Sequence, residues 1–347
     1  MAYTATDKPN AHNSSVLYTG NGGTQSITGV GFQPDIVWIK TRSTATYHSL
    51  SDAVNGTNLQ LGTNDSNAGD NFTTAITAFG SDGFSLGSNG NTNTGSRTFV
   101  GWNWKAGTTS GIATNGSTTI TPSAYSFNQT TGISIIKYTG NSTSGAKIAH
   151  GLGVKPDVMI VKATNAAYEW PVYHSSLGAT KLIELQSTAA ASTSSVSWND
   201  TEPDSVNFTV QANNRTNTGS VYVGYMFAEK QGYSKFSSYT GNGSTDGTFV
   251  YTGFKPSWLM IKVTNSVDSW RLWDNKRNTF NPMDITLRPN TTDGDYTASA
   301  NNIDFLSNGF KLRTTSGGYN GSSDTIAYMA FAENPFVTST GVPACAR

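Results

Sequence analysis

The sequence predicts an all-β protein with three tandem antiparallel β-sandwich repeats of the jelly-roll or concanavalin-like kind. Composition is the first observation: charged residues make up only 13% of the chain, aromatic residues 11%, and Gly alone contributes 36 residues. Thr, Val, Ile and aromatic side chains favour strands, whereas Gly and Asn favour turns. The second observation is a motif that occurs three times. The third is a set of apolar runs of strand length at matching places.

The repeated motif opens with Tyr-Thr-Gly-Asn and continues through a turn-rich stretch to Gly-x-x-Pro. An apolar run and then a lysine follow the proline in every copy. Such self-similarity, at a period of about 90–100 residues, indicates copies of one structural unit. The copies begin at Tyr18, Tyr138 and Tyr239, their prolines are Pro34, Pro156 and Pro256, and their lysines are Lys40, Lys162 and Lys262.

Each part of the motif predicts an element. Tyr-Thr-Gly-Asn should end a strand in a hairpin-like turn, and each proline should stand just before a strand because it lacks an N–H. The apolar runs at 36–39, 158–161 and 258–261 predict central strands that are buried on both faces. The closing segments at 99–104, 221–227 and 326–331 alternate, which predicts strands with one buried face. Residues 50–55 and 73–78 are expected to form single helical turns.

The motif also predicts how the chain is divided. An N-terminal arm (1–15) and a C-terminal tail (335–347) lack periodicity, and we expect them to become ordered against a partner. Residues 107–132 are rich in Gly, Thr, Ser and Asn and predict a linker with one strand at 117–121. The three β-sandwich repeats are expected at 16–106, 133–230 and 231–334.

Charge and cysteine content exclude several classes of protein. Lys plus Arg and Asp plus Glu balance at 22 each without long blocks, which argues against a nucleic-acid groove or a membrane-binding basic patch. No apolar stretch approaches the roughly 18–20 residues of a membrane-spanning helix, and the first residues do not resemble a signal peptide. The single cysteine, Cys345, cannot form a disulfide within the chain. We expect a protein made in a cytoplasm.

The residues that commonly carry catalysis form no recognisable constellation, so we expect neither an enzyme nor a cofactor or metal. The four histidines lack metal-ligand spacing, although His48 and His174 are expected at related places in copies one and two. Asp35 and Asp157 follow the prolines and are interpreted as turn residues. No phosphate loop, nucleophile elbow or calcium loop is present. The candidate acids for glycoside hydrolysis are Glu169, Glu184, Glu202, Glu229 and Glu333, and their placement suggests no pair.

Four aromatic residues form the most specific candidate site. Trp170 and Tyr173 in copy two and Trp270 and Trp273 in copy three lie in the same variable strand, flanked by polar residues. Aromatic faces can stack on sugars, but they also dominate cores and interfaces. The sequence leaves three interpretations open: packing of the protein's own core, contact with another subunit, and contact with a glycan.

Several long segments resemble a known group of proteins. These are the start MAYTATDKPNAHNSSVLYTGNGGTQSITGVGFQPDIVWIK, the close GWNWKAG, the join SIIKYTGNSTSGAKIAHGLGVKPDVMIVK and the ending FAENPFVTSTGVPACAR. They resemble the repeat-bearing structural proteins of marine tailed bacteriophages, such as those that infect cyanobacteria. The resemblance implies a virion surface protein with lectin-like sandwiches, and it supplies no catalytic residues.

The sequence thus yields three hypotheses about function. The first is a non-enzymatic virion structural protein, either a capsid decoration or head-fibre subunit or a tail appendage. The second is a receptor-binding adhesin that recognises a host-surface polysaccharide, and the third is a glycan-cleaving depolymerase. The expected partners are further copies of the chain, with a trimer as the first expectation, other capsid or tail proteins, and a host-surface glycan. Neither nucleic acid nor membrane is expected as a partner.

Overall fold

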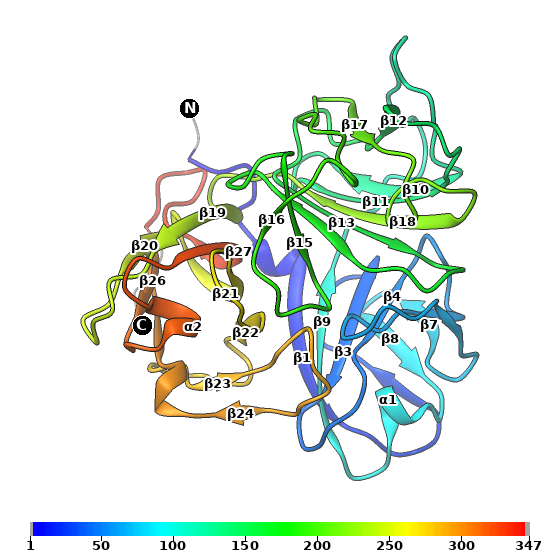
Figure 1. Cartoon of the computed structure of the whole chain (residues 1–347). Coiled ribbons are helices and arrows are strands. Elements are labelled where there is room, and N and C mark those ends of the chain that lie inside the picture. The colour runs from blue at the N-terminus through cyan, green and yellow to red at the C-terminus, as the bar shows by residue number, and fades with distance from the viewer. Residues whose placement is uncertain (1–2, 344–347) are drawn as a thin grey trace.

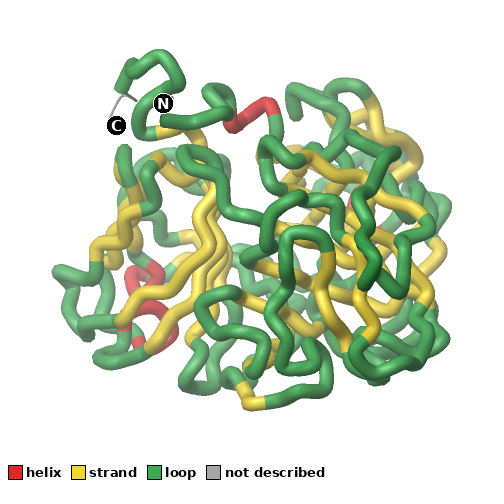
Figure 2. Tube along the Cα trace, turned by 90° about the horizontal axis from the view of Figure 1, so that it is seen from above, coloured by secondary structure: helices red, strands yellow, loops and turns green. Residues whose placement is uncertain are grey.

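Three lobes surround a common centre, and each lobe contains one copy of the sequence repeat (Figure 1). The computed structural model describes residues 3–343 and is all-β, with several antiparallel sheets. Strands and loops make up nearly all of the described chain (Figure 2). The short helices are η1 (Pro9–Ala11), α1 (Gly90–Asn93), η2 (Ser299–Asn301) and α2 (Gly317–Asn320).

The same order of four strands recurs in every copy, with the opening strand, closing strand, central strand and following strand side by side. In copy two this order is part of a seven-stranded sheet. We call the three sheets that contain this order of strands the inner sheets. In spatial order they are β1 (Asn13–Thr19), β9 (Thr98–Trp104), β3 (Ile36–Thr41) and β4 (Ser49–Asp52); β10 (Ala124–Asn128), β11 (Ile133–Thr139), β18 (Val221–Phe227), β13 (Val158–Ala163), β14 (Pro171–His174), β15 (Lys181–Glu184) and β16 (Ser192–Thr193); and β19 (Ser234–Thr240), β27 (Thr325–Pro335), β21 (Phe254–Val263) and β22 (Arg271–Asp274).

A smaller outer sheet accompanies each inner sheet, and two-stranded ribbons extend copies one and three. The outer sheets are β2 (Gln25–Ile27), β8 (Gly83–Leu86) and β7 (Ile76–Gly80); β12 (Ala146–Ala149) and β17 (Asn207–Val210); and β20 (Phe249–Tyr251), β26 (Gly309–Leu312) and β25 (Ile303–Leu306). The ribbons pair β5 (Leu59–Gln60) with β6 (Asp70–Asn71), and β23 (Ile285–Thr286) with β24 (Tyr296–Thr297).

Alternate residues of the central strands point into two different cores. In β3, Ile36 and Trp38 belong to a core shared by all three copies, whereas Val37 and Ile39 belong to the core between the two sheets of copy one. β13 and β21 divide their residues in the same way. The prediction that these runs are buried on both faces is therefore confirmed.

The shared core lies where the three inner sheets face one another. Trp104, Phe227 and Phe331, one from each copy, form its aromatic centre, and the Phe331 ring lies 5.8 Å from the Trp104 ring and 5.9 Å from the Phe227 ring. An apolar cavity of about 40 Å³ lies beside them. This arrangement also corrects the prediction for the closing strands. They are buried on both faces, because one face meets the shared core and the other meets the outer sheet.

The Tyr-Thr-Gly-Asn motif recurs because it ties each inner sheet to the segment before its closing strand. The Tyr18 hydroxyl donates to the carbonyl of Thr92 at 2.7 Å. The Asn21 N–H donates to the side-chain oxygen of buried Asn93 at 2.9 Å, and the Asn93 amide donates back to Asn21 at 3.0 Å. The same contacts join Tyr138 and Asn141 to Thr216 and Asn217, and Tyr239 and Asn242 to Tyr319 and Asn320.

Four sequence predictions about local structure need correction. The motif ends a strand as expected but forms no hairpin, because the chain crosses from β1 to β2 in the outer sheet. Pro34 and Pro156 precede their strands, whereas Pro256 lies inside β21 at a break in the register, where its missing N–H is tolerated. Of the expected helical turns at 50–55 and 73–78, the residues 53–55 and 73–75 do turn, but 50–52 belong to β4 and 76–78 to β7, since pairing with a neighbouring strand outweighs local preference.

The predicted linker, 107–132, is ordered against copy two. Within it, β10 pairs with β11 and extends the inner sheet. The expected strand at 117–121 is only an isolated parallel bridge between Ile120 and Ile148, so the strand of this segment lies a few residues later than predicted. The segment covers one edge of the inner sheet and touches one edge of the outer sheet.

The described parts of the arm and tail contact copy three and each other. The Tyr3 hydroxyl donates to the carbonyl of Gly253 at 2.8 Å. Asp7 accepts hydrogen bonds from the backbone N–H and the hydroxyl of Ser339. Residues 344–347 of the predicted tail, with Cys345, lie outside the described residues. The domain boundaries themselves stay a prediction.

Candidate functional site

The structure places the four candidate aromatic residues inside the protein. Trp170, Tyr173, Trp270 and Trp273 are each at most 3% exposed. Their polar atoms are bonded within the chain: the Tyr173 hydroxyl donates to Glu202, and the Trp273 indole donates to the carbonyl of Asn301. No face of these rings is available to stack on a sugar or on another subunit. We therefore assign the four rings to packing.

Trp170 and Trp270 nevertheless have a specific role, because each reaches into the preceding copy. The Trp170 indole N–H donates to the carbonyls of Gly62 and Asp65 in copy one, at 3.2 and 3.0 Å. The Trp270 indole N–H donates to the carbonyl of Glu184 in copy two at 2.9 Å.

His48 occupies the corresponding place in copy one. Its Nε2 lies 3.1 Å from the carbonyl of Arg288 in copy three. Since a carbonyl can only accept, Nε2 carries the proton. The strand register pairs His174 with the start of the central strand, as it pairs Asp52 and Asp274. The predicted correspondence between His48 and His174 was therefore wrong. The counterpart of His174 in copy one is Asp52, four residues after His48, and the sequence hides this because the two residue types differ.

A second set of contacts between copies comes from Asp52, His174 and Asp274. Each of them meets the closing strand of the next copy. Asp52 accepts from the Tyr225 hydroxyl at 2.8 Å. Asp274 accepts from the Trp102 indole N–H at 3.0 Å. The third contact differs: His174 Nε2 donates to the backbone carbonyl of Tyr328 at 3.1 Å.

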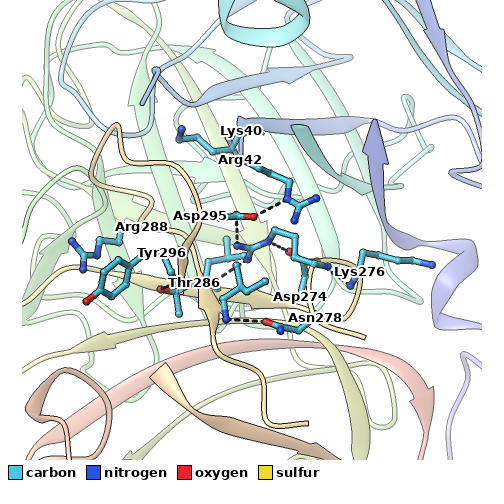
Figure 3. A network of polar contacts seen from close by, with 12 residues as sticks. Lys40, Arg42, Asp274, Lys276, Asn278, Thr286, Arg288, Asp295 and Tyr296 are labelled. Carbon is cyan, nitrogen blue, oxygen red and sulfur yellow. Dashed lines mark hydrogen bonds and ion pairs between the residues drawn. The ribbon is translucent and has the colours of Figure 1, made fainter. Parts of the chain in front are cut away.

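The joint between copies three and one contains a buried network of charges (Figure 3). Fully buried Arg277 pairs with Asp274 at 2.6 Å and with Asp295 at 3.1 Å, and Asp295 also pairs with Arg42 at 2.8 Å. Burial by itself would raise the pKa of Asp274, but the Arg277 guanidinium and several hydrogen bonds hold that pKa below its usual value. The network stays charged inside the protein and links the two copies.

The repeated lysines belong to the same joints. Burial lowers the pKa of Lys40, Lys162 and Lys262 to about 8. Lys162 donates to the carbonyl of Ser66 in copy one at 2.9 Å, and Lys262 donates to that of Thr188 in copy two at 3.3 Å. Lys40 lies near the carboxylates of copy three, which partly offset the effect of burial on its pKa.

Backbone hydrogen bonds close these contacts into a ring. One loop of each copy donates a single N–H to the copy that follows it, and copy three donates to copy one. The three bonds run from Gly69 to Thr164 at 2.9 Å, from Ala191 to Thr264 at 2.8 Å and from Asp295 to Arg42 at 2.7 Å. All the contacts between two neighbouring copies make up one joint, so the ring has three joints. Together they hold the copies around the shared core.

The residues that could support catalysis are engaged in structure. Burial lowers the pKa of His150 and His174 to about 4 and that of His48 well below its usual value, so all three rings are neutral near pH 7. Within 3–343, no group of three or more His, Cys, Asp or Glu residues is placed to hold a metal ion. The candidate acids all form ion pairs: Glu169 and Glu184 with Arg215, Glu202 with Lys155, Glu229 with Lys235, and Glu333 with Lys255.

Copy one contains a pocket that sequence reasoning missed. The cavity has a volume of about 260 Å³, and we call it the first-copy pocket; its lining includes Tyr47, Gln60, Asp65, Asp70, Phe72 and Asn91. The Tyr47 side chain is 48% exposed, whereas Gln60 is only 4% exposed, and its Oε1 has no hydrogen-bond partner among the described residues. Three larger hollows, of about 350, 440 and 480 Å³, have no aromatic side chain in their linings.

One sequence signal could have pointed to the pocket. Tyr47 is an aromatic residue where the aligned positions of the other copies carry Glu169 and Ser269, and Asp65 and Asp70 follow within one loop. This alignment becomes visible only when His48 is matched to Trp170.

Comparison with known proteins gives one match. The sequence profile of a family described as a domain of unknown function, DUF7483, matches residues 8–335. No curated protein and no solved structure matches the chain. No helix among the described residues is both long and apolar enough to span a membrane.

Proposed function

The chain belongs to the DUF7483 family, whose function is unknown, and we propose that it is a non-enzymatic structural protein of a bacteriophage virion surface. It would serve as a capsid decoration or head-fibre subunit, or as a tail appendage. The structural role is supported above all by the closed ring of joints. The virion location is supported by the resemblance of the start, the joins and the ending of the sequence to structural proteins of marine phages.

We propose further that the three copies are tandem β-sandwich repeats of the jelly-roll or concanavalin-like kind. In each copy one apolar cluster contacts strands of both the inner and the outer sheet, which supports face-to-face packing. The shared core and the joints then make the repeats one rigid body rather than three linked modules. A rigid body with few exposed charges suits repeated, symmetric assembly with further copies, of which a trimer is the simplest, and with other virion proteins.

A second function, that of a host-binding adhesin, is favoured by one observation. The first-copy pocket presents an exposed tyrosine ring beside carboxylates and amides. A glycan-cleaving activity receives less support, because every candidate glutamate is held in an ion pair.

Antibody labelling of particles tests the structural role. Antibodies against the purified protein are applied to phage particles from lysates that contain the gene, and the particles are viewed by electron microscopy beside a pre-immune control. Label at a fixed place on intact particles, with the protein found in the same particles by mass spectrometry, is expected. Intact particles that lack both the label and the protein would refute a structural virion role.

A further inference from the structure

The first-copy pocket exists because copy one departs from the packing of copy two. Asn91 lies two residues before buried Asn93, which is hydrogen-bonded to Asn21 of the Tyr-Thr-Gly-Asn motif. The same position in copy two is Arg215. Arg215 pairs with Glu169 at 3.3 Å and with Glu184 at 3.0 Å, and Glu169 is the counterpart of Tyr47. An arginine and two carboxylates therefore fill in copy two the space that a short amide leaves open in copy one.

Copy three fills the equivalent space in another way. Gly62, whose carbonyl accepts the Trp170 hydrogen bond, corresponds to Arg288, whose carbonyl accepts from His48. The Arg288 guanidinium lies over the Tyr296 ring at 4.8 Å. Copy one has no side chain at that place. The pocket is thus a specific feature of one copy within an otherwise repeated fold.

We propose that the first-copy pocket binds one residue of a neutral sugar. The Tyr47 ring is exposed and can stack on the apolar face of a sugar ring, with Phe72 also in the lining. Asp65 and Asp70 offer carboxylate oxygens, and Gln60 contributes an amide whose oxygen lacks a partner among the described residues. Sugar hydroxyl groups are the donors that such an acceptor-rich lining requires.

The charges of the pocket select against acidic sugars. Asp65 and Asp70 contribute two negative charges, and no lysine or arginine belongs to the lining. The Lys162 ammonium of copy two, outside the lining, interacts with Asp65 and offsets part of one charge, which leaves the pocket net negative. His48, at the base, has a pKa well below its usual value because it is buried, so it supplies no positive charge near pH 7. A carboxylate or sulfate on the ligand would be repelled.

The binding groups are held in place before a ligand arrives. Gln60 and Asp70 are direct partners in the β5–β6 ribbon. The Asp65 carboxylate accepts from the backbone N–H and the side-chain amide of Asn67, at 3.0 and 2.9 Å. The Gly69 N–H anchors the same loop to copy two. Such preorganisation lowers the entropy cost of binding a small, weakly held ligand.

Four variants of the full-length protein test this proposal. Asn91→Arg fills the pocket as Arg215 does in copy two, Gln60→Leu removes the buried amide, and Tyr47→Ala removes the ring. Asn58→Ala, at an exposed residue that directly precedes β5 and lies outside the pocket lining, is the control. Binding is measured by saturation-transfer NMR and calorimetry with neutral mono- and oligosaccharides of glucose, galactose, mannose and N-acetylglucosamine. Glucuronate serves as the acidic probe, and circular dichroism confirms that each variant is folded.

We expect the wild type to bind at least one neutral sugar with millimolar affinity, and glucuronate not to bind. Tyr47→Ala should weaken binding by about tenfold, the size expected for loss of one stacking contact. Asn91→Arg and Gln60→Leu should abolish binding, and Asn58→Ala should leave it unchanged. Failure of every neutral sugar to bind, binding that survives both Asn91→Arg and Gln60→Leu, or binding of glucuronate alone would overturn the proposal. The structural role is separate from the pocket, since particle labelling does not depend on sugar binding.

Discussion

Two joints place a polar side chain against the closing strand of the next copy, but in one joint that side chain accepts a hydrogen bond and in the other it donates one. At the joint between copies three and one, the closing strand offers the Trp102 indole N–H, and an acid, Asp274, faces it. At the joint between copies two and three, the equivalent closing-strand residue is Met329, which offers no donor, and His174 donates to a backbone carbonyl instead. The residue type at the position of His174 and Asp274 therefore matches the group that the closing strand of the next copy presents to it. A position in a repeat can thus vary in residue type while it keeps one structural role.

Loss of the buried charge pair at the first of these joints should have the largest effect. Asp274→Asn leaves Arg277 buried with only Asp295 as a charged partner. Removal of one member of a buried pair typically costs about 3–5 kcal/mol, and we expect that loss in the free energy of unfolding from denaturant titration. Asp293→Asn, at a carboxylate that is 52% exposed and pairs loosely with Arg288, is the matched control and should change stability by less than about 0.5 kcal/mol. Equal effects of the two changes would show that the network does not hold the joint.

An exchange of chemistry between the joints should have the next largest effect. His174→Asp places a carboxylate against the Tyr328 carbonyl without a donor, which we expect to cost about 3 kcal/mol. Met329→Tyr supplies the donor that copy two provides with Tyr225. The double variant should recover at least about 1 kcal/mol relative to the sum of the single changes in a double-mutant cycle. Additive effects would mean that the two positions are not coupled as the comparison requires.

The histidine joint should also make stability depend on pH. Burial lowers the folded-state pKa of His174 to about 4, whereas an unfolded histidine titrates near pH 6.5. As pH falls from about 6.5 towards 4, the unfolded chain takes up the proton first, so the free energy of unfolding decreases, by up to about 3 kcal/mol. His174→Gln should flatten this decrease by one proton relative to the wild type, as measured by urea titrations between pH 7 and pH 5. Parallel curves for the two proteins would contradict the assignment.

The smallest effect is expected at the joint between copies one and two. Tyr225→Phe removes one hydroxyl donor from Asp52, which keeps its two hydrogen bonds from Asn55 at 2.8 and 2.9 Å. We expect a loss of about 1–2 kcal/mol in thermal or denaturant unfolding. A loss as large as that of Asp274→Asn would show that the charge network adds nothing to its joint.

The sequence was sufficient to predict the all-β character of the fold and the recurrence of the Tyr-Thr-Gly-Asn motif. Both depend on local signals, such as the composition and the Tyr-Thr-Gly-Asn motif, whose tyrosine and asparagine make the same contacts in every copy. The burial of the central strands on both faces followed from the apolar runs at 36–39, 158–161 and 258–261. These features recur because each copy needs them to fold.

The joints could not be predicted, because their partners lie far apart in the chain and differ in residue type. Lys162 was visible as the end of a strand, but its acceptor, the carbonyl of Ser66, carries no side-chain signal. His48 and Trp170 were not matched, because an imidazole and an indole differ too much to suggest a shared role. In the structure both donate to a backbone carbonyl of a neighbouring copy, His48 to copy three and Trp170 to copy one. The first-copy pocket was missed for a related reason: it arises where Asn91 is shorter than Arg215.

The shared core and the joints should make the three copies one cooperative unit. Differential scanning calorimetry of the whole chain tests it most directly. We expect a single transition whose calorimetric enthalpy, roughly 240 kcal/mol for a chain of 347 residues, equals its van't Hoff enthalpy. Separate transitions, or a van't Hoff enthalpy near one third of the calorimetric value, would show that the copies unfold independently.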